Sequence, residues 1–163
     1  MTPTEMQETD KGVLRRAMLL HLQDMTADER MARSEKICAR VAESDEWKRA
    51  ERLVLFSPFR TEPAIASLQT AAVAGGREVL VIPQTLRDES ELALRFVPDF
   101  ILVPGLAFTK QCQRLGRGSG FYDRLLAGRA AGAFKMGVCF ALQLRDRIPQ
   151  NEHDVVLHAV ISD

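Results

Sequence analysis

The sequence predicts a single α/β domain, residues 1–163, with a mostly parallel sheet, helices on both faces and two helices at the amino end. Apolar runs of strand length lie at 52–59, 78–83, 100–108 and 135–140, separated by helical or loop segments. Short strands that are apolar throughout and alternate with helices are typical of a parallel sheet covered on both sides. A chain of 163 residues is also long enough to bury the core of one such domain.

The first helix is predicted over residues 11–25, where apolar side chains recur three or four positions apart. Lys11 and Arg15 lie four apart on a neighbouring stripe of that helix, so they share one side of it. Residues 1–10 are expected to be flexible. The alternative for both cations is a solvated helix face.

Two further helices follow from their end signals. Thr26 with Glu29 fits a capping box, so a helix is expected to begin there and run toward Ser44. A third helix is expected from Glu62 to a glycine stop at Gly75. Residues 84–99 are charged and irregular, with one possible short strand at "LALRFV".

Composition narrows the classes of function. The 22 Lys and Arg residues balance 22 Asp and Glu residues, which argues against a general nucleic-acid or membrane-surface partner. No apolar run approaches the roughly 20 residues that span a bilayer, and the amino end lacks the pattern of a signal peptide. The three cysteines have no close metal-ligand spacing and are expected to be reduced thiols. A cytoplasmic location is therefore expected.

The stretch "RLGRGSGFYDR", residues 114–124, places three glycines between arginines shortly after the apolar run 100–108. Ligands of open α/β sheets bind beyond the carboxyl ends of the strands. Glycines there can adopt positive φ and let an anion approach the backbone, and a helix that begins near Gly120 would offer free N–H groups.

This stretch is expected to bind a phosphate group. Arg114, Arg117 and Arg124 would supply charge-assisted hydrogen bonds, and Asp123 could hold a divalent metal. The stretch lacks the Lys-Ser/Thr of a P-loop. A plain glycine-rich connection with solvated arginines is an equally good interpretation of the spacing alone.

Several motifs together resemble the 5-formyltetrahydrofolate cyclo-ligase family, also called methenyltetrahydrofolate synthetase. They are "VPGLAF" at 103–108, the stretch at 114–124 and "PQNEHDVVLHAVISD" at 149–163, in this order and spacing. The pair Lys11 and Arg15, "PFRTE" at 58–62 and "VIP" at 81–83 extend the resemblance over nearly the whole chain. It is strongest from Asp99 onward.

The resemblance implies an ATP- and Mg²⁺-dependent enzyme. In that family ATP phosphorylates the formyl oxygen of 5-formyltetrahydrofolate, nitrogen 10 attacks the activated carbon, and loss of phosphate leaves 5,10-methenyltetrahydrofolate and ADP. Such chemistry requires positioning and charge neutralisation, with no covalent nucleophile. The implied partner is a small-molecule folate, with neither nucleic acid nor membrane, and the chain is expected to be a monomer or a weak homodimer.

The resemblance also implies a role for particular residues. Catalytic roles fall to Lys11, Arg117, Tyr122 and Asp123, with Asp123 as the magnesium ligand. Folate contacts fall to Phe59, Glu62 and Tyr122; for Glu62 the alternative is an ordinary acid in the first turn of a helix. The ATP site comprises Lys11, Arg15, Arg114, Gly116, Arg117, Gly118, Ser119, Gly120, Phe121 and Tyr122.

The chain departs from the family pattern at several points. Residues 84–99 form a shorter segment than in the family, and Thr109 and Cys112 replace the Asp and Gly of a Phe-Asp-x-x-Gly motif. His158 replaces the last aspartate of the closing His-Asp-x-x-x-Asp motif, which begins at His153, and Phe121 replaces a tyrosine. Two other hypotheses therefore stay open. One is a diverged nucleotide- or phosphate-binding protein of the same fold without folate turnover, and the other is a sugar-phosphate isomerase on a similar scaffold.

Overall fold

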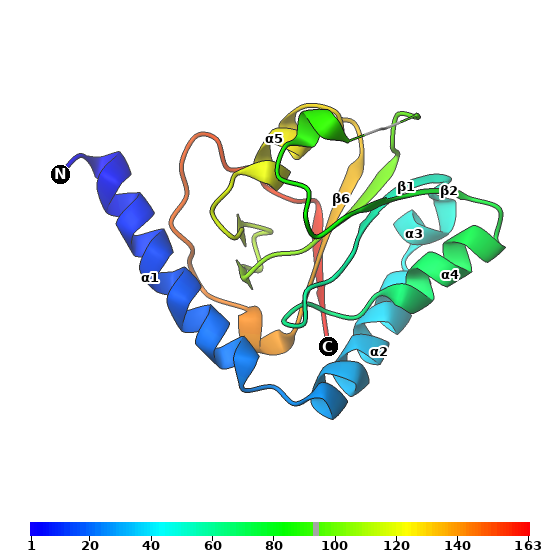
Figure 1. Cartoon of the computed structure of the whole chain (residues 1–163), viewed down its shortest axis with the longest axis horizontal. Coiled ribbons are helices and arrows are strands. Elements are labelled where there is room, and N and C mark those ends of the chain that lie inside the picture. Colours follow the sequence, from blue (N-terminus) through cyan, green and yellow to red (C-terminus); the bar gives the residue numbers. More distant parts are fainter. Residues whose placement is uncertain (93–94) are drawn as a thin grey trace.

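A five-stranded sheet lies at the centre of the computed structural model, which describes residues 1–92 and 95–163 (Figure 1). The strand order is β2-β1-β3-β6-β7, and every pairing described in this sheet is parallel. Its strands are β1 (Arg52–Phe56), β2 (Glu78–Ile82), β3 (Phe100–Val103), β6 (Phe134–Cys139) and β7 (Ala159–Ser162).

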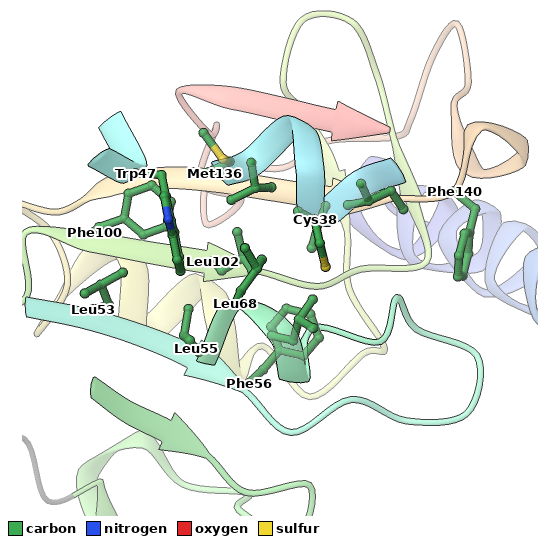
Figure 2. Close-up of a cluster of buried hydrophobic side chains, with 14 of the residues drawn as sticks. Cys38, Trp47, Leu53, Leu55, Phe56, Leu68, Phe100, Leu102, Met136 and Phe140 are labelled. Carbon is green, nitrogen blue, oxygen red and sulfur yellow. The ribbon is translucent and has the colours of Figure 1, made fainter. Parts of the chain in front are cut away.

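Helices cover both faces of this sheet. Leu53 and Leu55 of β1 pack into one hydrophobic cluster, whereas Val54 between them packs into the other. The first cluster includes side chains of α1 (Pro3–Gln23), α2 (Ala27–Glu43), α3 (Asp45–Arg49) and α4 (Ala66–Ala74), and the second includes those of α5 (Phe121–Ala127). Figure 2 shows the first cluster, where Trp47 meets Phe100 edge to face. The predicted α/β fold with helices on both faces is confirmed.

Two helices begin at residues other than those expected. Helix α1 begins at Pro3 instead of near Lys11, because Thr2 and Glu5 form a capping box that satisfies the first backbone N–H groups. Helix α4 begins only at Ala66, four residues after Glu62. The Glu62 carboxylate instead accepts a hydrogen bond from the backbone N–H of Phe59 at 2.7 Å and closes a turn ahead of the helix.

Other elements were missed or divided. The apolar run 100–108 breaks at Pro104 and Gly105 into β3 and the short β4 (Ala107–Phe108), which pairs antiparallel with β5 (Arg114–Leu115). Helix α3 and strand β7 had no prediction. The strand considered at "LALRFV" includes residues 93–94 and lies outside the described residues.

The connections create a switch point in the sheet. From β1 the chain passes through α4 to β2 on one side, and it then returns to the other side of β1 to form β3. Loops that leave neighbouring strands in opposite directions open a crevice at their carboxyl ends, the usual ligand site of an open α/β sheet. In the part of the chain that the structure describes, no helix combines the length and the apolar character needed to cross a membrane.

Candidate active site

A cleft of about 890 Å³ lies at this switch point. Its floor includes Phe56 and Ser57, which end β1, and Pro104 and Gly105, which follow β3. Every residue assigned to a site from the sequence lines this one cleft: Lys11, Arg15, Phe59, Glu62, Arg114, Gly116, Arg117, Gly118, Ser119, Gly120, Phe121, Tyr122 and Asp123.

The glycine turn, residues 116–120, forms one side of the cleft, as the motif predicted. Gly118 has φ +113° and Gly120 has φ +72°, a backbone conformation that L side chains rarely adopt. The side chain of Arg15 from α1 lies against this turn, and its Nε donates to the carbonyl of Gly116 at 3.0 Å. A cation from the first helix therefore contacts the glycine turn, although the two bonded residues are 101 positions apart in the sequence.

Lys11 lies one helical turn before Arg15 and is almost fully buried. Its Nζ is 2.6 Å from Oδ2 of Asp154, and a weaker partner, Glu8, stands 3.6 Å away. Asp154 also accepts from the backbone N–H of Asn151 at 2.8 Å. Lys11 is thus no solvated surface group, since it joins α1 to the loop before β7.

Arg114 is buried beneath the glycine turn. Its guanidinium donates from Nη1 to the carbonyl of Pro104 at 3.1 Å and lies over the ring of Tyr122, 5.4 Å from the ring centre. Its Nε has no hydrogen-bond partner among the described residues. A Cβ added at Gly116 would stand 2.9 Å from this guanidinium, so glycine there makes room for the arginine.

Asp123 faces the cleft from the first turn of α5. Its Oδ1 accepts from the backbone N–H of Val155 at 3.1 Å, and its Oδ2 lies 3.5 Å from Nη2 of Arg114. The described residues hold no cluster of three or more His, Cys, Asp or Glu side chains able to bind a metal by themselves. A Mg²⁺ ion usually takes only one or two carboxylates and completes its shell with water and phosphate oxygens, so Asp123 fits that kind of site.

Glu62, Phe59 and Arg117 form a second group in the cleft. Glu62 is buried, and Arg117 reaches across so that its Nη2 stands 3.8 Å from Oε2 of Glu62 and donates to Oγ1 of Thr61 at 3.0 Å. The Arg117 guanidinium also stacks over Phe59, 4.5 Å from the ring centre. Burial raises the pKa of Glu62 above its ordinary 4.5, against the opposing hydrogen bond from Phe59 and the charge of Arg117.

The remaining predicted residues serve the turn and the pocket wall. The side chain of Ser119 accepts from the N–H of Phe121 at 3.3 Å. Phe121 is buried and meets Tyr122 edge to face, with 5.1 Å between ring centres. Burial raises the pKa of Tyr122 well above its ordinary value, so its hydroxyl stays protonated at neutral pH and can donate a hydrogen bond.

Two departures from the family pattern have structural explanations. Cys112 has φ +65°, the left-handed conformation that suits the family's glycine, and Thr109 accepts from the N–H of Gln113 at 3.2 Å and closes the same turn. His158 lies outside the cleft: its Nδ1 accepts from the N–H of Lys135 at 2.9 Å, and its ring stacks on Phe134. Neither substitution removes a group from the cleft lining.

Sequence reasoning missed part of the lining. Glu8 enters the cleft because α1 begins eight residues earlier than expected, and Gln84, Leu86 and Arg87 line it from the segment after β2. The spacing of Glu8 to Lys11 and Arg15 on one helix side was available as a signal. The residues after β2 carry no motif, so only the fold places them here.

A glycine-lined cleft at the switch point of a parallel sheet is typical of the class of α/β proteins that bind small molecules beyond the carboxyl ends of their strands. The model of the 5-formyltetrahydrofolate cyclo-ligase family matches residues 7–98 and 82–163, and the chain belongs to this family. The membership predicted from the motifs, as an enzyme family, is confirmed.

Relatives and solved structures agree with this assignment. The chain is similar to 5-formyltetrahydrofolate cyclo-ligase of Mus musculus, with 25% identity over 93% of this chain and 92% of the relative. It is 47% identical to the enzyme of the same name from Mycolicibacterium smegmatis over 39% of this chain and 33% of that one. The 5,10-methenyltetrahydrofolate synthetase of Aquifex aeolicus has a similar structure, with TM-score 0.78, 26% identity and coverage of 93% and 88%. That of Mycoplasma pneumoniae gives TM-score 0.76, 22% identity and coverage of 94% and 99%.

Proposed function

We propose that this chain catalyses the ATP- and Mg²⁺-dependent cyclisation of 5-formyltetrahydrofolate to 5,10-methenyltetrahydrofolate, with release of ADP and phosphate. One observation carries the proposal: residues from α1, the loop after β1 and the glycine turn converge on a single cleft. The family membership and the names of the relatives support the same activity.

The cleft fits its two small molecules on separate sides. The glycine turn with Arg15 offers backbone N–H groups and positive charge to a triphosphate, and the buried Nε of Arg114 has no partner within residues 1–92 and 95–163. Bound ATP and Mg²⁺ would supply the phosphoryl group and offset its charge, with Asp123 as the protein ligand of the metal. Lys11 would add a second cation from α1.

The folate side is defined by Phe59, Glu62 and Tyr122. A carboxylate can accept two N–H donors from the amino-pyrimidine edge of a pterin, and Glu62 lies buried where such an edge would be held out of water. Tyr122 lies between both groups of residues and keeps its proton, so it can donate toward either substrate. The residues bind, orient and exclude water, which is what phosphoryl transfer requires of a protein.

We further propose that the protein acts in the cytoplasm, as a monomer or a weak homodimer. Three free cysteines, two of them buried, are consistent with a reducing compartment.

The decisive test mixes purified protein with 5-formyltetrahydrofolate, ATP and Mg²⁺ and follows the near-ultraviolet absorbance of the methenyl product. We expect product with the parent chain and at least a hundredfold lower rate, about 2.7 kcal/mol, for Asp123→Asn, because charge neutralisation at the phosphates is lost. ATP binding without any product would instead favour the diverged binding protein. Absence of both would contradict the cyclo-ligase and the nucleotide-binding protein alike.

A further inference from the structure

The segment after β2, residues 84–92, forms a wall of the cleft and is fixed to the body of the protein at separate points. At its start, Nε2 of Gln84 donates to the carbonyl of Pro58. At its end, the carbonyl of Leu92 accepts a hydrogen bond from Arg129. Between them lies the short 3₁₀ helix η1 (Glu89–Glu91), which packs against α5.

One guanidinium, that of Arg124, joins this wall to the glycine turn. Its Nε donates to Oε2 of Glu89 at 2.8 Å, and its Nη1 donates to the backbone carbonyl of Ser119 at 2.7 Å. The ion pair lowers the pKa of Glu89, so the carboxylate stays charged at neutral pH. A Cβ at Gly120 would stand 2.9 Å from Nη1, so the turn leaves space for this arginine by having glycine there.

The bond to Ser119 has a direct effect on the turn. Because a peptide unit is planar, a fixed carbonyl of Ser119 also fixes the direction of the N–H of Gly120. Gly118 and Gly120 both have positive φ and could otherwise rotate more freely than other residues. Arg124 therefore holds the orientation of a backbone donor in the proposed phosphate site and, through Glu89, also holds the wall at 84–92.

We propose that Arg124 is a positioning residue that couples the wall at 84–92 to the glycine turn. The two substrate sides of the cleft are thereby held in a fixed position relative to each other. The proposal rests on the proposed function, since the glycine turn is the side assigned to ATP, and Gln84 of the wall bonds to Pro58, the neighbour of Phe59 on the side assigned to the folate. The shortened segment of this chain is thereby kept in place by an ion pair with α5.

The first test needs no substrate and compares Glu89→Ala with a matched control, Glu91→Ala. Glu91 belongs to the same 3₁₀ helix and is exposed, and its side chain makes no ion pair within residues 1–92 and 95–163. We expect backbone amides of 84–92 to exchange with deuterium about two- to fivefold faster in Glu89→Ala, the range of an exposed ion pair, and to be unchanged in Glu91→Ala. Equal exchange in the two variants would overturn the proposal, whatever the enzyme assay shows.

The second test separates the two sides of the cleft by their KM values. Glu89→Ala retains the bond from Arg124 to Ser119, so we expect its KM for 5-formyltetrahydrofolate to rise about two- to fivefold with the KM for ATP unchanged. Arg124→Ala should raise both.

The charge-swapped double variant Glu89→Arg with Arg124→Glu restores the link to the wall but not the bond to Ser119. We expect its KM for the folate to return to the parent value and its KM for ATP to stay raised. Two results would show that Arg124 has no positioning role. One is a KM for the folate that is as high in the swapped variant as in Glu89→Ala. The other is an Arg124→Ala variant with both KM values unchanged.

Discussion

Glu62 illustrates how a single side chain acquires its properties from its surroundings. As a first-turn helix acid it would be exposed and ionised, but the structure buries it beside Phe59 and lets its carboxylate close a turn. The free-energy cost of removing the Glu62 charge from water exceeds the stabilisation of that charge by Arg117, so the pKa of Glu62 is raised. A buried acid with a displaced pKa in a cleft is characteristic of a working site.

This pKa predicts how stability depends on pH. Because the folded-state pKa of Glu62 lies above the ordinary 4.5, the folded chain binds this proton more tightly than the unfolded chain. The contribution of the Glu62 proton to the free energy of unfolding is complete below pH 4.5, and it is lost as pH rises through the raised pKa. We expect the free energy of unfolding of the parent to fall relative to Glu62→Gln over this window. Urea unfolding of both proteins from pH 4 to pH 8 measures the difference, and parallel curves would contradict the expectation.

At the scale of elements, α1 is attached to the rest of the protein by buried apolar side chains, such as Met18 and Leu22, and by two cations. Lys11 pairs with Asp154, which precedes β7, and Arg15 bonds the glycine turn. Both members of the first pair are mostly removed from water. An ion pair in such a place is costly to break from one side, because Lys11 would stay buried with only the weaker partner Glu8, 3.6 Å away.

We therefore expect Asp154→Ala to lower the free energy of unfolding by about 3–5 kcal/mol, whereas the double variant Lys11→Met with Asp154→Leu recovers most of the loss. Urea denaturation followed by far-ultraviolet circular dichroism measures both. Asp154→Ala within about 1 kcal/mol of the parent would show that solvent reaches Lys11 and that the pair does not anchor the helix.

The elements differ in how far the sequence could predict them. Strands β1, β2 and β6 were predictable because most of their residues are apolar, and α2 because its capping box is local. Strand β7 is a half-buried edge strand of four residues, and only its pairing with β6, far away in sequence, makes it a strand. The signal for the true start of α1 was present in Thr2 and Glu5. The wall at 84–92 carries no periodicity, so its place follows only from tertiary contacts.

At the scale of the whole molecule, the cleft joins parts that are far apart in the chain. Its lining extends from Glu8 in α1 to Val155 before β7. The glycine motif predicted an anion site at the strand ends, and the switch point of the sheet explains why α1 and the closing loop reach that same place. A ligand bound there contacts segments that separate on unfolding, so it should stabilise the entire fold.

The last prediction uses this linkage to test the phosphate side. With Mg²⁺ and ATP at about 100 times Kd, the folded state gains about 2.7 kcal/mol, which raises Tm by about 5–10 °C for a chain of this size. Gly118→Ala places a Cβ at φ +113° in the cleft and should abolish the shift. The matched control is Gly76→Ala, whose φ of +75° is also positive but lies outside the cleft, with no atom of the described residues beyond its chain neighbours within 4 Å of the new Cβ. Both variants should lose stability by about 1 kcal/mol without ligand, but only Gly76→Ala should keep the shift in Tm. An equal shift in both would place the nucleotide elsewhere on the protein.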